Sequence, residues 1–143
     1  VPESKCGPST GTVANVVDGD TVDLEDGERL RLLLADTPET TGGRDDCYGQ
    51  EAKQFTTEQL LGKKVTLTYD EAGCTDRFGR TLAYVKAGSV DVNAELVKRG
   101  YACFLYISPS GGDREEEFAT YESEARTERL GMWGSCTSIP CSQ

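Results

Sequence analysis

Apolar and polar positions alternate in short runs along most of the chain. Such alternation predicts strands that turn one face to a core and the other to solvent. Asp26 and Gly27 separate two of these runs and suit a tight hairpin turn, because an Asp-Gly pair accepts positive φ. Strands are therefore expected at residues 12–17, 21–24, 29–35, 64–70 and 80–87.

Helical periodicity fills three other segments. One helix is expected at residues 48–61, with Gly62 as its stop, and a short one is expected from an Asn93 cap to Gly100. The last should open on a capping box at residues 113–116 and end at Gly131. One helix before the fourth strand and two after the fifth predict an α+β, mainly β fold. We expect a five-stranded OB-type Greek-key barrel with three α-helices.

The predicted hairpin places two carboxylates together. Antiparallel strands joined at residues 26 and 27 bring the start of one strand and the end of the next to the same end of the sheet. Asp20 stands at the first place and Asp36 at the second, and each shares the parity of its apolar neighbours. Neighbouring carboxylates repel unless a positive charge lies between them, so we expect a divalent cation there. Ca²⁺ suits the site because it takes carboxylates, carbonyls and water in flexible geometry. The alternative is two independently solvated aspartates in turns.

Charged residues around this pair indicate phosphate chemistry. Arg31 precedes Asp36 in the same strand, and Arg80 stands where a polar loop re-enters the fifth strand. A guanidinium matches phosphate oxygens in a bidentate way, although a solvated surface charge is the alternative for any single arginine. Glu39, just beyond Asp36, is placed to orient or deprotonate an attacking water. Strict alternation puts Arg31 on the face opposite Asp36, so the two meet only if the strand coils or bulges near its end.

Composition narrows the chemistry further. A chain of 143 residues suits one domain, and no apolar run reaches the roughly 18 residues of a membrane span. The chain has no histidine, which excludes Ser-His-Asp and Cys-His nucleophile systems. The formal net charge of −10 argues against broad, sequence-independent adhesion to nucleic acid. It leaves room for a small basic cleft in an acidic body.

The chain contains six cysteines, and such a number in a short chain indicates disulfides and an oxidising compartment. We therefore expect a secreted or periplasmic protein. No C-x-x-C pair and no histidine is present, so structural zinc is not expected. The sequence shows no signal-peptide pattern, and we expect Val1 to begin a mature or trimmed chain. The residues alone leave the cysteine pairing open.

Several motifs, taken together and in order, resemble the thermonuclease (micrococcal-nuclease-like) family over residues 11–134. The motifs are DGDTV at residues 18–22, RLLLADTPET at 31–40, YGQEA at 48–52, DRFGRTLAY at 76–84 and NAELV at 93–97. The resemblance implies a nuclease-like OB domain between an arm at residues 1–10 and a tail at 135–143. It implies a Ca²⁺-dependent endonuclease that acts on DNA and RNA and leaves 3′-phosphate ends.

The resemblance also implies residue roles. Asp20 and Asp36 would be the calcium carboxylates, with Thr37 offering its backbone carbonyl. Glu39 would position or deprotonate water. The implied phosphate clamps are Arg31 and Arg80, and the implied substrate contacts are Arg77, Phe78 and Tyr106. A second aromatic expected near Tyr106 is replaced by Ser108. By the packing of the family, the expected disulfides are Cys47–Cys74, Cys103–Cys136 and Cys6–Cys141.

Two other functions are compatible with the same fold. One is a catalytically silent OB module that binds single-stranded nucleic acid or a protein, and the other is a disulfide-stapled calcium-binding structural domain. A pure binder has no need for an oriented carboxylate beside two arginines, so the filled positions favour the nuclease. We expect a monomer with no membrane association.

Overall fold

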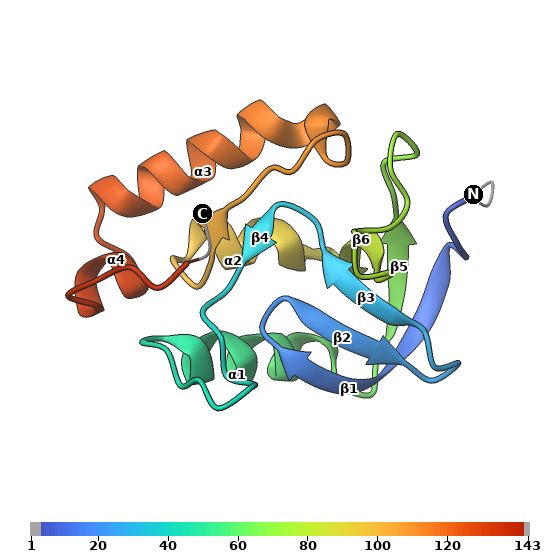
Figure 1. Cartoon of the computed structure of the whole chain (residues 1–143), viewed down its shortest axis with the longest axis horizontal. Coiled ribbons are helices and arrows are strands. Elements are labelled where there is room, and N and C mark those ends of the chain that lie inside the picture. The colour runs from blue at the N-terminus through green and yellow to red at the C-terminus, as the bar shows by residue number, and fades with distance from the viewer. Residues whose placement is uncertain (1–3, 142–143) are drawn as a thin grey trace.

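A closed barrel of five strands forms the body of the molecule, as the sequence predicted (Figure 1). The computed structural model describes residues 4–141, so residues 1–3 of the predicted arm and 142–143 of the predicted tail lie outside it. Neighbouring strands follow the order β3-β2-β1-β5-β6, and a parallel pairing of β3 with β6 closes the barrel. The barrel strands are β1 (Thr10–Asp18), β2 (Thr21–Leu24), β3 (Arg29–Leu32), β5 (Lys64–Thr68) and β6 (Thr81–Ala87).

The three predicted helices are α1 (Gly49–Leu60), α2 (Val92–Lys98) and α3 (Glu115–Thr127). In Figure 1, α2 lies between the other two, and it contacts both of them. None of the helices within residues 4–141 has the length and hydrophobicity that a membrane crossing requires. The shorter elements are β4 (Ala35–Asp36), β7 (Val90–Asp91), β8 (Cys103–Phe104), the 3-10 helix η1 (Gly112–Arg114) and α4 (Met132–Ser135).

The apolar positions of these elements form one core. In β5, Val65 and Leu67 are buried while the residues on either side of them are exposed, which is the alternation that predicted the strand. Ala52 and Phe55 of α1 are buried as predicted, and Phe118 of α3 is buried completely. Burying an apolar side chain of this size stabilises the fold by about 1.5–3 kcal/mol.

The strand predicted at residues 29–35 is interrupted, and the interruption positions the site. Strand β3 ends at Leu32, and Leu34 takes a left-handed conformation with φ 67° before β4 begins at Ala35. Burial of both Leu33 and Leu34 favours this turn, because a regular strand would have sent one of them to the opposite face. The turn breaks the alternation, so Arg31 and Asp36 reach the same side.

The starts of α2 and α3 differ from the prediction. Asp91, not Asn93, caps α2, and its carboxylate accepts a hydrogen bond from the N–H of Ala94 at 3.2 Å. Asn93 is a buried residue of the helix that bonds the backbone of Leu33, Ala83 and Val85, and this explains an amide in an apolar surround.

The capping box predicted for α3 is also absent. Arg114 stands at the N-cap without a side-chain cap bond, because the carboxylate of Asp113 accepts the hydroxyl of Tyr84 at 2.8 Å instead. The helix ends at Thr127, and Gly131 precedes the separate turn α4.

The three predicted disulfide pairings were wrong. The observed bonds are Cys6–Cys74, Cys47–Cys136 and Cys103–Cys141. The first forms because the N-terminal arm runs along the loop after β5, where Ser4 and the N–H of Lys5 both donate to Glu71. Cys141 lies beside β4, with its sulfur 3.6 Å from the carbonyl oxygen of Asp36, so it pairs with Cys103 and not with Cys6.

Candidate active site

An open cavity of about 1020 Å³ lies where the barrel meets three loops. It is lined by β2 and β3, by the segment that follows β4, by the loop between β5 and β6, and by the segment after β8. Most of the charged residues selected from the sequence lie here. The charged lining residues are Asp18, Asp20, Arg29, Arg31, Asp36, Glu39, Arg44, Asp76, Arg77 and Arg80.

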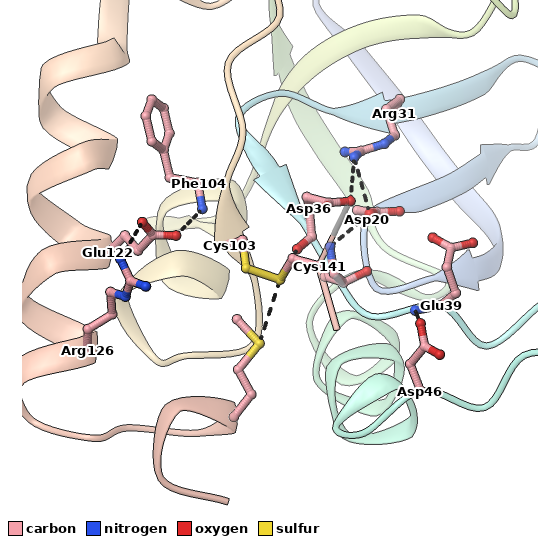
Figure 2. Close-up of a disulfide and its surroundings, with 12 residues drawn as sticks. Asp20, Arg31, Asp36, Glu39, Asp46, Cys103, Phe104, Glu122, Arg126 and Cys141 are labelled. Atoms are coloured by element: carbon pink, nitrogen blue, oxygen red, sulfur yellow. Dashed lines mark hydrogen bonds and ion pairs between the residues drawn. A yellow bond between two sulfur atoms is a disulfide. The ribbon is translucent and has the colours of Figure 1, made fainter. Parts of the chain in front are cut away.

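Asp20, Asp36 and Arg31 meet at the floor of the cavity (Figure 2). One terminal nitrogen of Arg31, Nη2, lies 3.3 Å from Asp20 Oδ2 and 3.3 Å from Asp36 Oδ1. Its other terminal nitrogen donates to the carbonyls of Leu32 and Ala35, both at 2.7 Å, which ties the guanidinium to the turn after β3. The structure therefore brings together the two aspartates that the predicted hairpin placed at one end of the sheet.

Both carboxylates are almost fully buried. Asp20 and Asp36 are each 3% exposed, and the guanidinium of Arg31 faces both of them. Asp20 also accepts the hydroxyl of Thr21 and the N–H of Thr37, both at 2.9 Å. Two carboxylates that lie close together repel each other unless positive charge lies between or beside them. The donor chemistry of this floor therefore fits a divalent cation.

Few side-chain ligands converge on this floor. Within residues 4–141, no three acidic or cysteine side chains come close enough to hold an ion by themselves. The floor offers two carboxylates, and the hydroxyl of Thr37 is buried beside them without a hydrogen-bond partner in the described part of the chain. An ion held here would complete its shell with backbone carbonyls and water.

Sequence reasoning missed Asp18, which holds the segment after Asp36 in place. Asp18 is buried, and its carboxylate accepts the N–H of Thr40 at 3.0 Å together with the hydroxyls of Thr40 and Thr41. The signal was present, because Asp18 shares the parity of Val16 and Asp20, but the residue was used only as the first position of the DGDTV motif. These bonds, with the Cys47–Cys136 disulfide, tie down the loop between β4 and α1.

Glu39 stands at the edge of the cavity. The next residue, Thr40, is held in place by its hydrogen bonds to Asp18. The N–H of Glu39 donates to Asp46 Oδ2 at 3.3 Å, and the carbonyl of Glu39 accepts the N–H of Asp46 at 3.0 Å. Burial raises the pKa of the Glu39 carboxyl, and the negative charges of Asp18 and Asp20 raise it further. A carboxylate with a raised pKa is a stronger base, so Glu39 is suited to accept a proton from water.

Arg80 enters the cavity from the loop between β5 and β6, and Asp76 orients it. The Nε of Arg80 donates to Asp76 Oδ2 at 2.7 Å, and its N–H donates to Asp76 Oδ1 at 3.0 Å. Burial opposes ionisation, but these bonds and one from the N–H of Phe78 hold the pKa of Asp76 below its usual value. In the described part of the chain, the terminal nitrogens of Arg80 make no hydrogen bond to protein. They are therefore available to a phosphate.

The remaining predicted contacts divide into two groups. Phe78 is 68% exposed at the cavity, and the guanidinium carbons of Arg77 and Arg80 lie 4.9 and 5.4 Å from its ring centroid. Tyr106 is not brought to the cavity lining of residues 4–141; it packs against the core, with its hydroxyl beside Gly112. The next residue, Ile107, is exposed and lines the cavity instead.

The net charge raised the question of whether an acidic chain still has a cavity lined by basic residues, and the arginines show that it does. The chain carries a formal net charge of −10, yet five arginines line this one cavity. Two of them, Arg29 and Arg44, were not singled out from the sequence. Arg29 forms an ion pair with Asp23, and Arg44 forms one with Asp46, both at 2.7 Å. The five arginines equal in number the carboxylates of the lining, so the cavity lacks the excess of negative charge that the whole chain carries.

Comparison with known proteins identifies the family. The sequence model of one protein family, described as staphylococcal nuclease homologue, matches residues 29–135. The thermonuclease of Staphylococcus hyicus is 35% identical over 137 residues, which cover 92% of this chain and 80% of that protein. The thermonuclease of Staphylococcus intermedius is 37% identical over 126 residues, covering 85% of this chain and 74% of that protein.

An uncharacterised protein of Bacillus anthracis is 37% identical over 128 residues, which cover 86% of this chain but 60% of that protein. The chain thus spans somewhat more than half the length of this relative. The family match covers well over half of the chain and includes Arg31, Asp36, Glu39 and Arg80. The chain therefore belongs to the family of staphylococcal nuclease homologues, as its motifs indicated.

Proposed function

We propose that this chain is a calcium-dependent endonuclease that hydrolyses phosphodiester bonds of DNA and RNA and leaves 3′-phosphate ends. Membership of the nuclease family and the thermonuclease relatives support the hydrolysis of nucleic acid. The observation that carries the proposal is the meeting of Asp20, Asp36 and Arg31 on the floor of a cavity that Glu39 and Arg80 also line.

Asp20 and Asp36 would hold the calcium ion, together with the backbone carbonyl of Thr37 and water. Bound there, calcium would supply Lewis-acid polarisation of a phosphoryl oxygen. The protein contributes the position of these ligands. Asp20 is fixed by Thr21 and by the N–H of Thr37, and Arg31 faces both carboxylates.

Arg31 and Arg80 would bind the scissile phosphate. They approach the cavity from different elements, the end of β3 and the loop before β6. A guanidinium presents parallel donors that match two phosphate oxygens. These donors stabilise the transition state more than the ground state, because negative charge grows on the equatorial oxygens as phosphorus becomes five-coordinate.

Glu39 would accept a proton from the water that attacks phosphorus. The bond from this water oxygen to phosphorus forms as the bond from phosphorus to the 5′ oxygen breaks. The 5′ oxygen leaves and takes a proton from solvent, so one product ends in a 5′ hydroxyl and the other in a 3′ phosphate. Arg77 and Phe78 would bind the adjoining phosphate and base, since Phe78 offers an exposed ring for stacking.

The setting in which this enzyme works is also a proposal. We infer a secreted or periplasmic protein, because three disulfides persist in an oxidising compartment and are rare in the cytosol. We infer further that the chain acts as a monomer, since all of the charged groups invoked here line one cavity of a single chain.

The test is to incubate the protein with supercoiled plasmid and with RNA, in Ca²⁺, in Mg²⁺ and in a calcium chelator. We expect cleavage of both substrates in Ca²⁺, little in Mg²⁺ and none in the chelator. Enzymatic labelling of the product ends should find 5′ hydroxyls and 3′ phosphates. Full activity in the chelator would refute the metal requirement, and 5′ phosphates would refute the assigned leaving group.

A further inference from the structure

The carboxylate of Asp36 is carried by a very short strand. β4 has two residues and forms a two-stranded sheet with β8, in which Ala35 pairs with Phe104 and Asp36 with Cys103. The turn at Leu34 separates β4 from the barrel. A ladder of this length contributes few hydrogen bonds, so the position of Asp36 depends on what holds β8.

β8 is anchored on two sides. On one side, the N–H of Phe104 donates to the carboxylate of Glu122 in α3 at 2.9 Å. On the other side, Cys103 is bonded to Cys141, with 6.1 Å between their Cα atoms. Cys103 itself is 1% exposed. Because Glu122 belongs to α3 and Cys141 to the C-terminal segment, two distant parts of the chain fix the strand on which β4 depends.

The disulfide also touches Asp36 directly. The sulfur of Cys141 lies 3.6 Å from the backbone carbonyl oxygen of Asp36 and 3.9 Å from the sulfur of Met132. Figure 2 shows the disulfide on one side of Asp36 and the Asp20–Arg31 pair on the other. The backbone of Asp36 is therefore packed against the bridge while its carboxylate faces the cavity floor.

We infer that Cys103 and Cys141 are positioning residues of the proposed calcium site, acting through Asp36. The inference rests on the proposed function and deepens it by linking the metal site to the oxidation state of one disulfide. Removing the bridge should leave a folded protein in which β4 is less constrained and the two carboxylates no longer stay together. Changes to groups that orient metal ligands typically cost about 10–100-fold in metal affinity or activity.

The decisive variant is Cys103→Ala/Cys141→Ala, with Cys6→Ala/Cys74→Ala as its matched control. Both lose one disulfide, but the control bridge joins the N-terminal arm to the loop after β5, away from Asp36. Under conditions where circular dichroism shows both variants folded, we expect the first to need about 10–100-fold more Ca²⁺ for half-maximal cleavage. It should also show a smaller rise in melting temperature on adding Ca²⁺. The control bridge is attached to the loop that carries Arg80, so its loss can lower the cleavage rate, but the Ca²⁺ requirement and the rise in melting temperature should keep the parent values.

Hydrogen–deuterium exchange of the segment around β4 gives a readout that needs neither metal nor substrate. We expect its amides to exchange faster in the Cys103→Ala/Cys141→Ala variant than in the parent and in the control. Unchanged exchange, or a folded variant with the parent requirement for Ca²⁺, would overturn the inference. An inactive parent would refute the proposed function alone, and the exchange measurement would still decide whether the bridge positions Asp36.

Should the double cysteine variant not fold, Glu122→Ala takes its place. It removes the acceptor on the other side of β8 and leaves the disulfide intact. We expect a change in the same direction in both the exchange of β4 and the Ca²⁺ requirement. Parent values for both in a folded Glu122→Ala protein would show that the position of Asp36 does not depend on how β8 is held.

Discussion

Replacing Arg80 by lysine separates the geometry of phosphate binding from its charge. In the parent, Nε of Arg80 is held by Asp76 at 2.7 Å, while its terminal nitrogens are left for a phosphate. A lysine keeps the positive charge but has one nitrogen on a flexible stem. That nitrogen can stay with Asp76 or turn to the substrate, and it cannot present two parallel donors.

The size of the effect follows from where the second donor acts. Losing one preorganised donor to the developing charge typically costs about 10²–10³ in rate, or about 2.7–4 kcal/mol of transition-state stabilisation. The ground-state phosphate still meets a positive charge, so substrate binding should change far less. We therefore expect the loss in Arg80→Lys to fall on kcat and the KM to stay near that of the parent.

The assay is steady-state cleavage of a short labelled oligonucleotide in saturating Ca²⁺, with single-turnover rates measured alongside. Arg31→Lys should behave similarly, because Arg31 is the other proposed clamp. Arg126→Lys is the control, since Arg126 lies on α3 with 61% of its side chain exposed and should turn over like the parent. A parent-like kcat in Arg80→Lys would show that the clamp assignment is wrong.

Three further outcomes test other parts of the site and fold. Glu39→Gln keeps the shape but cannot accept a proton, so kcat should fall by about 10²–10⁴ in the same cleavage assay, and a parent-like rate would exclude that role. Asp18→Asn weakens the charge-assisted bonds to Thr40, and urea titration should find it about 1–3 kcal/mol less stable; equal stability would argue against that anchor. The hydrogen bond from Arg114 lowers the pKa of Glu117 to about 2, so its stabilisation is complete above the unfolded value near 4.5 and is lost as pH falls through 2. Melting temperatures of Glu117→Gln should therefore fall less than those of the parent over that range, and parallel curves would contradict this.

The barrel could be predicted because its signals are local and repeated. Alternation in β5 sets which residues are buried, and the Asp-Gly turn fixes the pairing of β2 with β3. That register predicted that Asp20 and Asp36 share one end of the sheet, and the turn at Leu34 completes their approach. Arg31 and Arg80 were assigned to phosphate from their places near this pair and from the chemistry of guanidinium, and the family motifs implied the same role.

What escaped prediction depends on contacts between distant segments. The left-handed turn at Leu34 has no glycine or asparagine to mark it, and it forms because both leucines of the turn are buried. Asn93 looked like a helix cap because asparagine is a common cap residue. Its buried bonds reach residues in other segments of the chain, and these have no local signal. The disulfides depend on where the arm and the C-terminal segment run, and neither path has a periodic signal.

An acidic chain can take a polyanion as its substrate because the charges near the phosphate decide binding. Surface charges farther away than the Debye length, about 8 Å at physiological salt, are largely screened. Inside the cavity, the proposed clamps Arg31 and Arg80 would act on a phosphate over hydrogen-bond distances, where screening is weak. The carboxylates closest to them are not simply repulsive, since Asp76 orients Arg80 and Asp20 and Asp36 are suited to a cation. Net charge therefore limits nonspecific adhesion to nucleic acid, and the cavity alone determines where a phosphodiester binds.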